Sequence, residues 1–185
     1  VDDVGRISML QVFMSFSVLF FCLGLDQAYV REYHESKNKP ALLKAVLFPS
    51  LALIILSFLL LAIYDLKIVS KWLYEIPSTY LSLITILCFV IALASRFLSL
   101  VLRMQERSFA FSMSQLLSTI IFLLNVINTV WLGFARDTYS LVTANTASMI
   151  LAFLVFTWNT KSEWLIAIKE QININELKSA FSFGW

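Results

Sequence analysis

Charged side chains are scarce in this 185-residue chain, where aspartate, glutamate, lysine and arginine together make up 14% of the residues. Soluble domains carry roughly a quarter, so this chain has too few charges to cover an ordinary water-exposed surface. The net charge is only +2, and no block of basic residues occurs. The charge pattern therefore argues against a nucleic-acid partner.

Side chains that carry chemistry are equally sparse. The two cysteines, Cys22 and Cys88, both lie inside apolar runs and lack the spacing of a disulfide or metal site. The one histidine, His34, lies in a polar connector, where a solvated side chain is the simplest interpretation. No Ser-His-Asp set, glycine-rich phosphate loop or pair of catalytic carboxylates is present. We therefore expect no catalytic residues, no metal, no cofactor and no enzymatic activity.

Apolar residues make up 59% of the chain, and they gather in stretches of about 20 residues, the length that crosses a bilayer as a helix. Backbone polar groups cannot stay unpaired in lipid, and runs this long do not suit barrel strands. The sequence predicts an all-α polytopic membrane helix bundle with about five complete transmembrane helices. The predicted spans are Ile7–Leu25, Ala45–Tyr64, Tyr80–Leu102, Phe109–Phe134 and Leu141–Trp158.

The segment after the last span is amphipathic. In "KSEWLIAIKEQI", Trp164, Leu165, Ile168 and Ile172 fall on one helical face, as expected of a helix that lies in the membrane interface. We predict an interfacial linker at 161–175 and, with Asn175 as N-cap, the start of another transmembrane helix at 176–185. Because the chain lacks an initial Met and stops within an apolar segment, we expect it to be a fragment.

The basic residues are distributed unevenly between the connectors. One set of alternate connectors, together with the tail and with Arg96 in the adjoining span, holds ten lysines and arginines, whereas the N-terminus and the other connectors hold four. Cytoplasmic loops carry the excess of basic residues in membrane proteins. The ten-residue side is therefore predicted to be cytoplasmic.

Arg96 is the one charge placed well inside a predicted span, about 10 Å before Arg103. If the helix continued to Arg107, the three arginines would share one face and form a ladder into the bilayer. A charge at such a depth is expensive and is a functional hypothesis by default. Either Arg96 faces a hydrophilic cavity or it pairs with an acid of another helix, for which Asp26 is a candidate.

The fourth predicted span is polar along one side. Gln115, Ser118, Thr119, Asn125 and Thr129 fall within about 120° of its helical wheel. This face either lines a hydrophilic cavity or forms hydrogen bonds between helices.

Three stretches resemble the polysaccharide flippases, the lipid-linked oligosaccharide and O-antigen translocases of the multidrug/oligosaccharidyl-lipid/polysaccharide exporter superfamily. They are "LGLDQAYVREYHE" after the first span, "LRMQERSFAFSMSQLLSTI" between the third and fourth, and the tail "LKSAFSFGW". The resemblance implies a two-lobe exporter fold and translocation of an undecaprenyl-pyrophosphate-linked oligosaccharide across the inner membrane. It further implies coupling to a proton or sodium gradient.

With the charge pattern, the resemblance assigns substrate binding to six residues: Arg31, Arg96, Arg103, Arg107, Gln115 and Asn125. Alternatives are a multidrug exporter of the same superfamily, a glycan polymerase or similar enzyme acting on polyprenyl phosphates, and a structural membrane subunit. A cation extruder would need acids in its cavity, and a polymerase would need a large periplasmic loop. The longest connector on that side, "DLKIVSKWLYEIPST", is short.

Overall fold

The computed structural model describes residues 2–36, 38–131 and 138–169, and every regular element in them is a helix. Four stretches are long and apolar enough to cross a membrane, and they are Gly5–Cys22, Lys39–Tyr64, Thr79–Met104 and Thr138–Asn159. They belong to helices α1 (Asp2–Cys22), α3 (Lys39–Tyr64), α5 (Thr79–Met104) and α7 (Thr138–Asn159), and a further long helix is α6 (Ser108–Trp131). The predicted all-α membrane bundle is confirmed.

The first span ends earlier than predicted. We expected a helix to Leu25, but α1 stops at Cys22 because Leu23 and Gly24 adopt left-handed conformations, with φ of 49° and 73°. Glycine reaches this region without steric penalty. A short separate helix, α2 (Leu25–Glu32), follows the break.

The second span begins earlier than predicted. Helix α3 starts at Lys39, where the side chain of Asn38 accepts a hydrogen bond of 3.3 Å from the backbone N–H of Ala41. Pro40 occupies the first turn, where its missing N–H has no effect. The cap and the proline fix the helix start ahead of the apolar run, so Lys44 lies inside the helix.

The prediction that Arg107 continues the row of arginines on one helical face is wrong. Helix α5 stops at Met104, and Glu106 has a φ of 58°. The backbone N–H of Arg107 closes the turn on the carbonyl of Leu102 at 3.1 Å. Arg107 therefore belongs to the turn before α6, not to the face of α5 that carries Arg96.

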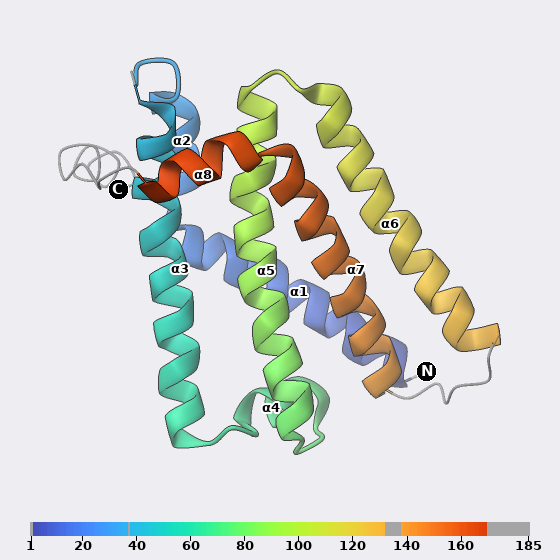
Figure 1. Cartoon of the computed structure of the whole chain (residues 1–185). Coiled ribbons are helices and arrows are strands. Elements are labelled where there is room, and N and C mark those ends of the chain that lie inside the picture. Colours follow the sequence, from blue (N-terminus) through green and yellow to red (C-terminus); the bar gives the residue numbers. More distant parts are fainter. Residues whose placement is uncertain (1, 37, 132–137, 170–185) are drawn as a thin grey trace.

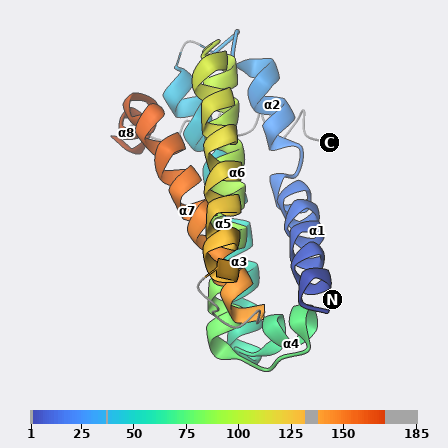
Figure 2. The ribbon, with the colours of Figure 1, turned by 90° about the vertical axis from the view of Figure 1, so that its right-hand side faces the viewer.

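Different connectors lie at the two ends of the bundle. Figure 1 shows α2, α8 (Lys161–Lys169) and the α5–α6 turn at one end, and α4 (Ile68–Tyr74) at the other. Figure 2, turned by 90°, again separates α2 from α4 by the length of the bundle. The alternate connectors that we grouped by charge thus share one end, as far as they lie in the described residues. Residues 170–185, which include Ile172, Asn175 and the predicted segment 176–185, lie outside the described residues.

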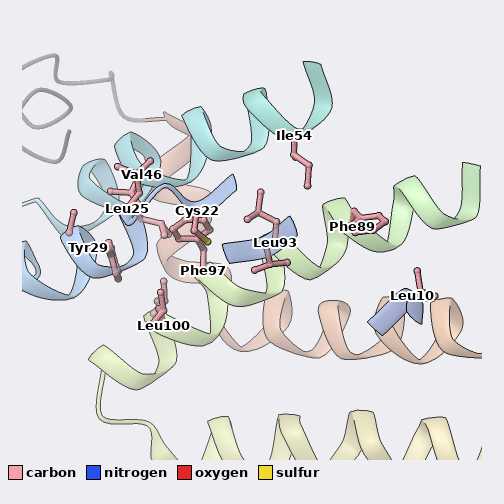
Figure 3. Packing of buried hydrophobic residues seen from close by; sticks show 14 of the residues in the cluster. Leu10, Cys22, Leu25, Tyr29, Val46, Ile54, Phe89, Leu93, Phe97 and Leu100 are labelled. Carbon is pink, nitrogen blue, oxygen red and sulfur yellow. The ribbon is translucent and has the colours of Figure 1, made fainter. Parts of the chain in front are cut away.

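The core forms around α5, which contacts α1, α3, α4, α6 and α7. Figure 3 shows its main apolar cluster, which includes Leu10, Cys22, Leu25, Tyr29, Val46, Ile54, Phe89, Leu93, Phe97 and Leu100. By contrast, α3 exposes many large apolar side chains along its second half. Such a surface would be unfavourable in water and suits contact with lipid.

Helix α4 is held to α5 by buried hydroxyl groups. The backbone N–H of Ser70 donates to Ser82 Oγ at 3.1 Å, and Tyr74 Oη lies 2.9 Å from Thr85 Oγ1. Burial raises the pKa of the Tyr74 phenol to about 12, so the phenol stays protonated at neutral pH. This connector is a closed cap on the bundle end, not an extended loop.

We predict that Ser82→Ala lowers the free energy of unfolding by about 1–3 kcal/mol, because the buried Ser70 N–H loses its acceptor. Thermal unfolding of the purified protein measures the effect. Ser57→Ala is the matched control, since Ser57 Oγ only donates 2.8 Å to Leu53 within α3. Equal Tm values for Ser82→Ala and Ser57→Ala would contradict the role of Ser82.

Orientation is tested with single cysteines at the exposed positions Glu35 and Glu75, in a background with Cys22 and Cys88 replaced. We expect an impermeant thiol reagent on intact cells to label position 75 and not position 35, because the end with α2 carries the excess of basic residues. Labelling of position 35 with protection of position 75 would reverse the orientation.

Candidate functional site: a polar groove with Arg96

A groove of about 460 Å³ runs between α1, α5, α6 and α7. Its polar lining residues are Gln11, Ser95, Arg96, Ser99, Gln115, Thr119, Asn145 and Ser148. The four helices are otherwise largely apolar, so polar side chains from four separate helices converge on one space. Bundles build ligand sites in this way, from side chains on facing helices.

Arg96 is the cation of this groove. Its Nη2 donates to Asp26 Oδ2 at 2.8 Å, and the relative exposures of the two side chains are 42% and 10%. Asp26 Oδ1 also accepts the backbone N–H of Gln27 at 3.0 Å, which fixes the carboxylate at the start of α2. The break at Gly24 turns α2 so that Asp26 can meet α5.

The two predicted alternatives for Arg96 are therefore combined in the structure. The candidate partner Asp26 does form the ion pair, and Arg96 also lines the polar groove. A guanidinium has five N–H donors, and a partly exposed one can bind a further anion. Arg96 lies eight residues before the end of α5, about 12 Å inside that helix end.

The polar face of α6 contributes Gln115 and Thr119 to the groove. Thr119 Oγ1 donates 3.2 Å to the carbonyl of Gln115 in its own helix. Gln115 thus lies in the same groove as Arg96, although the two residues were assigned to the site separately. Nothing is described for the side chains of Ser118, Asn125 and Thr129, so these parts of the predicted face lie outside the described residues.

Helix α7 supplies two groove residues that we did not predict. Asn145 and Ser148 are buried and polar, and Ser148 Oγ donates to the Asn145 carbonyl at 2.7 Å. The available signal was a cluster of polar residues, "TANTAS", near the start of an apolar span. Gln11 of α1 was also missed, because a single polar residue in an apolar helix carries no directional signal.

The other predicted arginines lie outside the groove. Arg31 is exposed on α2, and the Arg103 guanidinium carbon lies 5.8 Å from the Phe111 ring centroid. Arg107 Nη1 donates to the carbonyl of Asn159 at 3.3 Å, which ties the α5–α6 turn to the end of α7. The structure therefore brings together Arg96 and Gln115, but not Arg31, Arg103 or Arg107 with them.

A second polar recess, of about 540 Å³, lies at the same end of the bundle as α2. Its lining includes His34, Lys39, Glu106 and Arg107. Lys39 Nζ lies 4.4 Å from the centroid of the Tyr33 ring. The recess gathers basic side chains at the end of the bundle that lies nearer to Arg96 along α5.

The side chains of the groove can bind a polar or anionic ligand. Within residues 2–36, 38–131 and 138–169, no group of three His, Cys, Asp or Glu side chains is placed to hold a metal ion. Arg96 can donate two parallel hydrogen bonds to a phosphate or carboxylate. The amides and hydroxyls around it can donate to and accept from a polyhydroxylated ligand.

Comparison with known proteins places the chain in a family. Residues 1–185 match the model of the family described as "Polysaccharide biosynthesis protein". No curated protein and no solved structure matches the chain. Because the family match extends over all 185 residues and four apolar helices can cross a bilayer, the chain is a membrane protein and belongs to the polysaccharide biosynthesis protein family.

Proposed function

We propose that the protein translocates an undecaprenyl-pyrophosphate-linked oligosaccharide from the cytoplasmic to the periplasmic leaflet of the inner membrane. The observation that supports this most directly is the groove in which Arg96, Gln115, Asn145 and Ser148 meet between apolar helices. A glycan and a pyrophosphate cannot enter hydrocarbon without losing their hydrogen bonds to water. The polar side chains that line the groove can replace the hydrogen bonds that the ligand makes to water.

Arg96 has the chemistry to receive the charged part of this ligand. Arginine suits phosphate because its planar fork donates two parallel, charge-assisted hydrogen bonds. A cation is required in the path because an unpaired dianion inside a membrane would be expensive. In this account Gln115 and Asn145 bind sugar hydroxyls, whose donors and acceptors match those of amides.

In the absence of ligand, the Asp26 carboxylate forms an ion pair with the Arg96 guanidinium. The pair is 2.8 Å long, and Arg96 remains 42% exposed on the groove side. A pyrophosphate would therefore compete with a carboxylate of lower charge for the same guanidinium. The exchange lets the empty groove keep its cation paired and the loaded groove bind the headgroup.

The proposal includes no catalytic step. Energy for directional transport would come from a proton or sodium gradient, and the recess with Lys39 and Arg107 would attract the headgroup at the cytoplasmic surface. Basic clefts raise the local concentration of anionic ligands.

Deletion of the gene and complementation test the function against its rivals. Loss of translocation should trap the complete lipid-linked oligosaccharide on the cytoplasmic leaflet, where an external glycosidase or lectin cannot reach it. The wild-type protein should restore access. If the protein were a polymerase, its deletion would instead leave single repeating units on the periplasmic leaflet. If it were a multidrug exporter, its deletion would leave the glycan unchanged and raise drug sensitivity. Either result would overturn the proposal.

A further inference from the structure

The break between α1 and α2 holds the backbone of a leucine in an unfavourable conformation. Leu23 has a φ of 49° and Gly24 a φ of 73°. Glycine adopts a positive φ without penalty, but the Cβ of any other residue then lies too close to the following carbonyl oxygen. Strained residues of this kind persist only where surrounding contacts impose them, and they are common in switch regions. Contacts around the break must therefore hold Leu23 in this conformation.

The sequence around the break also fits an uninterrupted helix. Val18, Cys22, Leu25 and Tyr29 are all buried, and they follow one another at spacings of four, three and four residues. This is the spacing of one helical face, and in a continuous helix the four side chains would lie within about 60° of one another. The same apolar face can be buried with the break or without it, so burial alone does not select the bent form.

The ion pair between Asp26 and Arg96 is a contact that selects the bent form. Figure 1 shows α1 crossing the bundle obliquely, whereas α2 lies beside one end of α3. This change of direction accompanies the contact of 2.8 Å between Asp26 Oδ2 and Arg96 Nη2. Helical dihedral angles at Leu23 and Gly24 would instead continue α2 along the axis of α1 and turn the Asp26 side chain away. The ion pair thus offsets the strain at Leu23.

We propose that Leu23 and Gly24 form a hinge, and that release of Arg96 from Asp26 lets α1 and α2 join into one helix. The link to a ligand rests on the proposed function, because a pyrophosphate that takes the Arg96 guanidinium removes the contact that holds the hinge bent. By linkage, the straight form binds the anion more tightly than the bent form. The hinge couples occupancy of the polar groove to the direction of α2.

The distance between spin labels on the two helices measures the hinge. Val12 of α1 and Val30 of α2 are both exposed. They are 18 residues apart, which places their backbones about 27 Å apart in a continuous helix. Cysteines at these positions, in purified protein with Cys22→Ala and Cys88→Ala, carry the labels. Double electron–electron resonance then separates the bent population from the straight one.

Asp26→Asn tests the role of the ion pair without any ligand. We expect the ratio of straight to bent form to rise about tenfold, as loss of one charged hydrogen bond implies. Glu75→Gln removes the same charge from an exposed position at the opposite end of the bundle and should leave the ratio unchanged. Monodisperse elution verifies that each variant is folded.

Substitutions at the hinge shift it without touching the ion pair. Gly24→Ala adds the penalty for positive φ and should raise the straight population about tenfold. Leu23→Gly removes that penalty, so in the Asp26→Asn background it should restore the bent form. Gly5→Ala is the matched control, since Gly5 lies within α1 with open space around it. Should Asp26→Asn not fold, Gly24→Ala still decides.

An identical distance distribution in wild type, Asp26→Asn and Gly24→Ala would overturn the hinge. Normal export alongside that result would leave the proposed translocation untouched. Undecaprenyl pyrophosphate, added to protein with the native hinge, tests the link to the ligand separately. It should raise the straight population, whereas undecaprenol, which lacks the pyrophosphate, should not. A hinge that responds to Asp26→Asn but not to undecaprenyl pyrophosphate would overturn its control by the headgroup.

Discussion

Arg96→Ala is expected to reduce glycan export per folded molecule by at least about 100-fold. Two charge-assisted hydrogen bonds to the headgroup would be lost, each worth roughly 1.5–3 kcal/mol, and 1.4 kcal/mol corresponds to a factor of ten. Arg96→Lys should restore only part of the export, because an ammonium cannot form the planar two-bond contact. Export is measured as surface glycan relative to the amount of membrane-inserted protein.

The ion pair complicates this substitution. Without Arg96 the Asp26 carboxylate, which is 10% exposed, loses its cation, and the protein should lose about 1–3 kcal/mol of stability. The double variant Asp26→Asn/Arg96→Ala removes both charges and should recover folded protein without recovering export. Arg103→Ala is the matched control, since Arg103 lies on the same helix, is exposed and lies outside the groove. Normal export from the folded double variant would exclude a headgroup role.

The charge exchange Asp26→Arg/Arg96→Asp is expected to have an equally large effect on export. The exchange keeps an acid and a base at the 2.8 Å contact, so a purely structural pair would tolerate it. It moves the cation to α2 and puts a carboxylate in the groove beside Gln115 and Ser99. A carboxylate there repels a pyrophosphate, so export should fall by about 100-fold or more, as like charges in close contact imply.

Protein accumulation and Tm are measured in the same membranes as export. We expect both to lie closer to wild type in the exchange variant than in Asp26→Arg alone, because the single variant places two cations together. Export at the wild-type level in a stable exchange variant would show that Arg96 serves only to hold α2 against α5.

The sequence predicted the bundle because long apolar runs have one physical solution in lipid. It did not predict the break after Cys22, since only Gly24 marks it and a single glycine in an apolar run often stays helical. That break matters, because it sets Asp26 opposite Arg96. The prediction that the helix continues to Arg107 was wrong for a similar reason. The turn at Glu106 contains no glycine or proline from which it could be predicted.

The site was only partly predictable. A charge in an apolar span singled out Arg96, and a periodic polar face singled out Gln115, because burial in lipid makes both expensive unless they are used. Arg103 and Arg107 were included because their spacing to Arg96 would place them on one helical face, and Arg31 was included because of the family resemblance. The structure places all three outside the groove. Asn145 and Ser148 were missed because small polar residues are common wherever helices of a membrane bundle touch.

The most direct test of the polar groove as the translocation path is the reactivity of a cysteine at Thr119. This position lies about 16 Å inside α6 from its start at Ser108 and lines the groove. Ile120, one residue further and about 100° around the helix, is half exposed on an apolar face and serves as the depth-matched control. In purified protein lacking Cys22 and Cys88, the account predicts that a water-soluble thiol reagent modifies position 119 and spares position 120. It also predicts that lipid-linked oligosaccharide slows the reaction at position 119. Protection of both positions, or a rate at 119 that the lipid-linked oligosaccharide leaves unchanged, would contradict it.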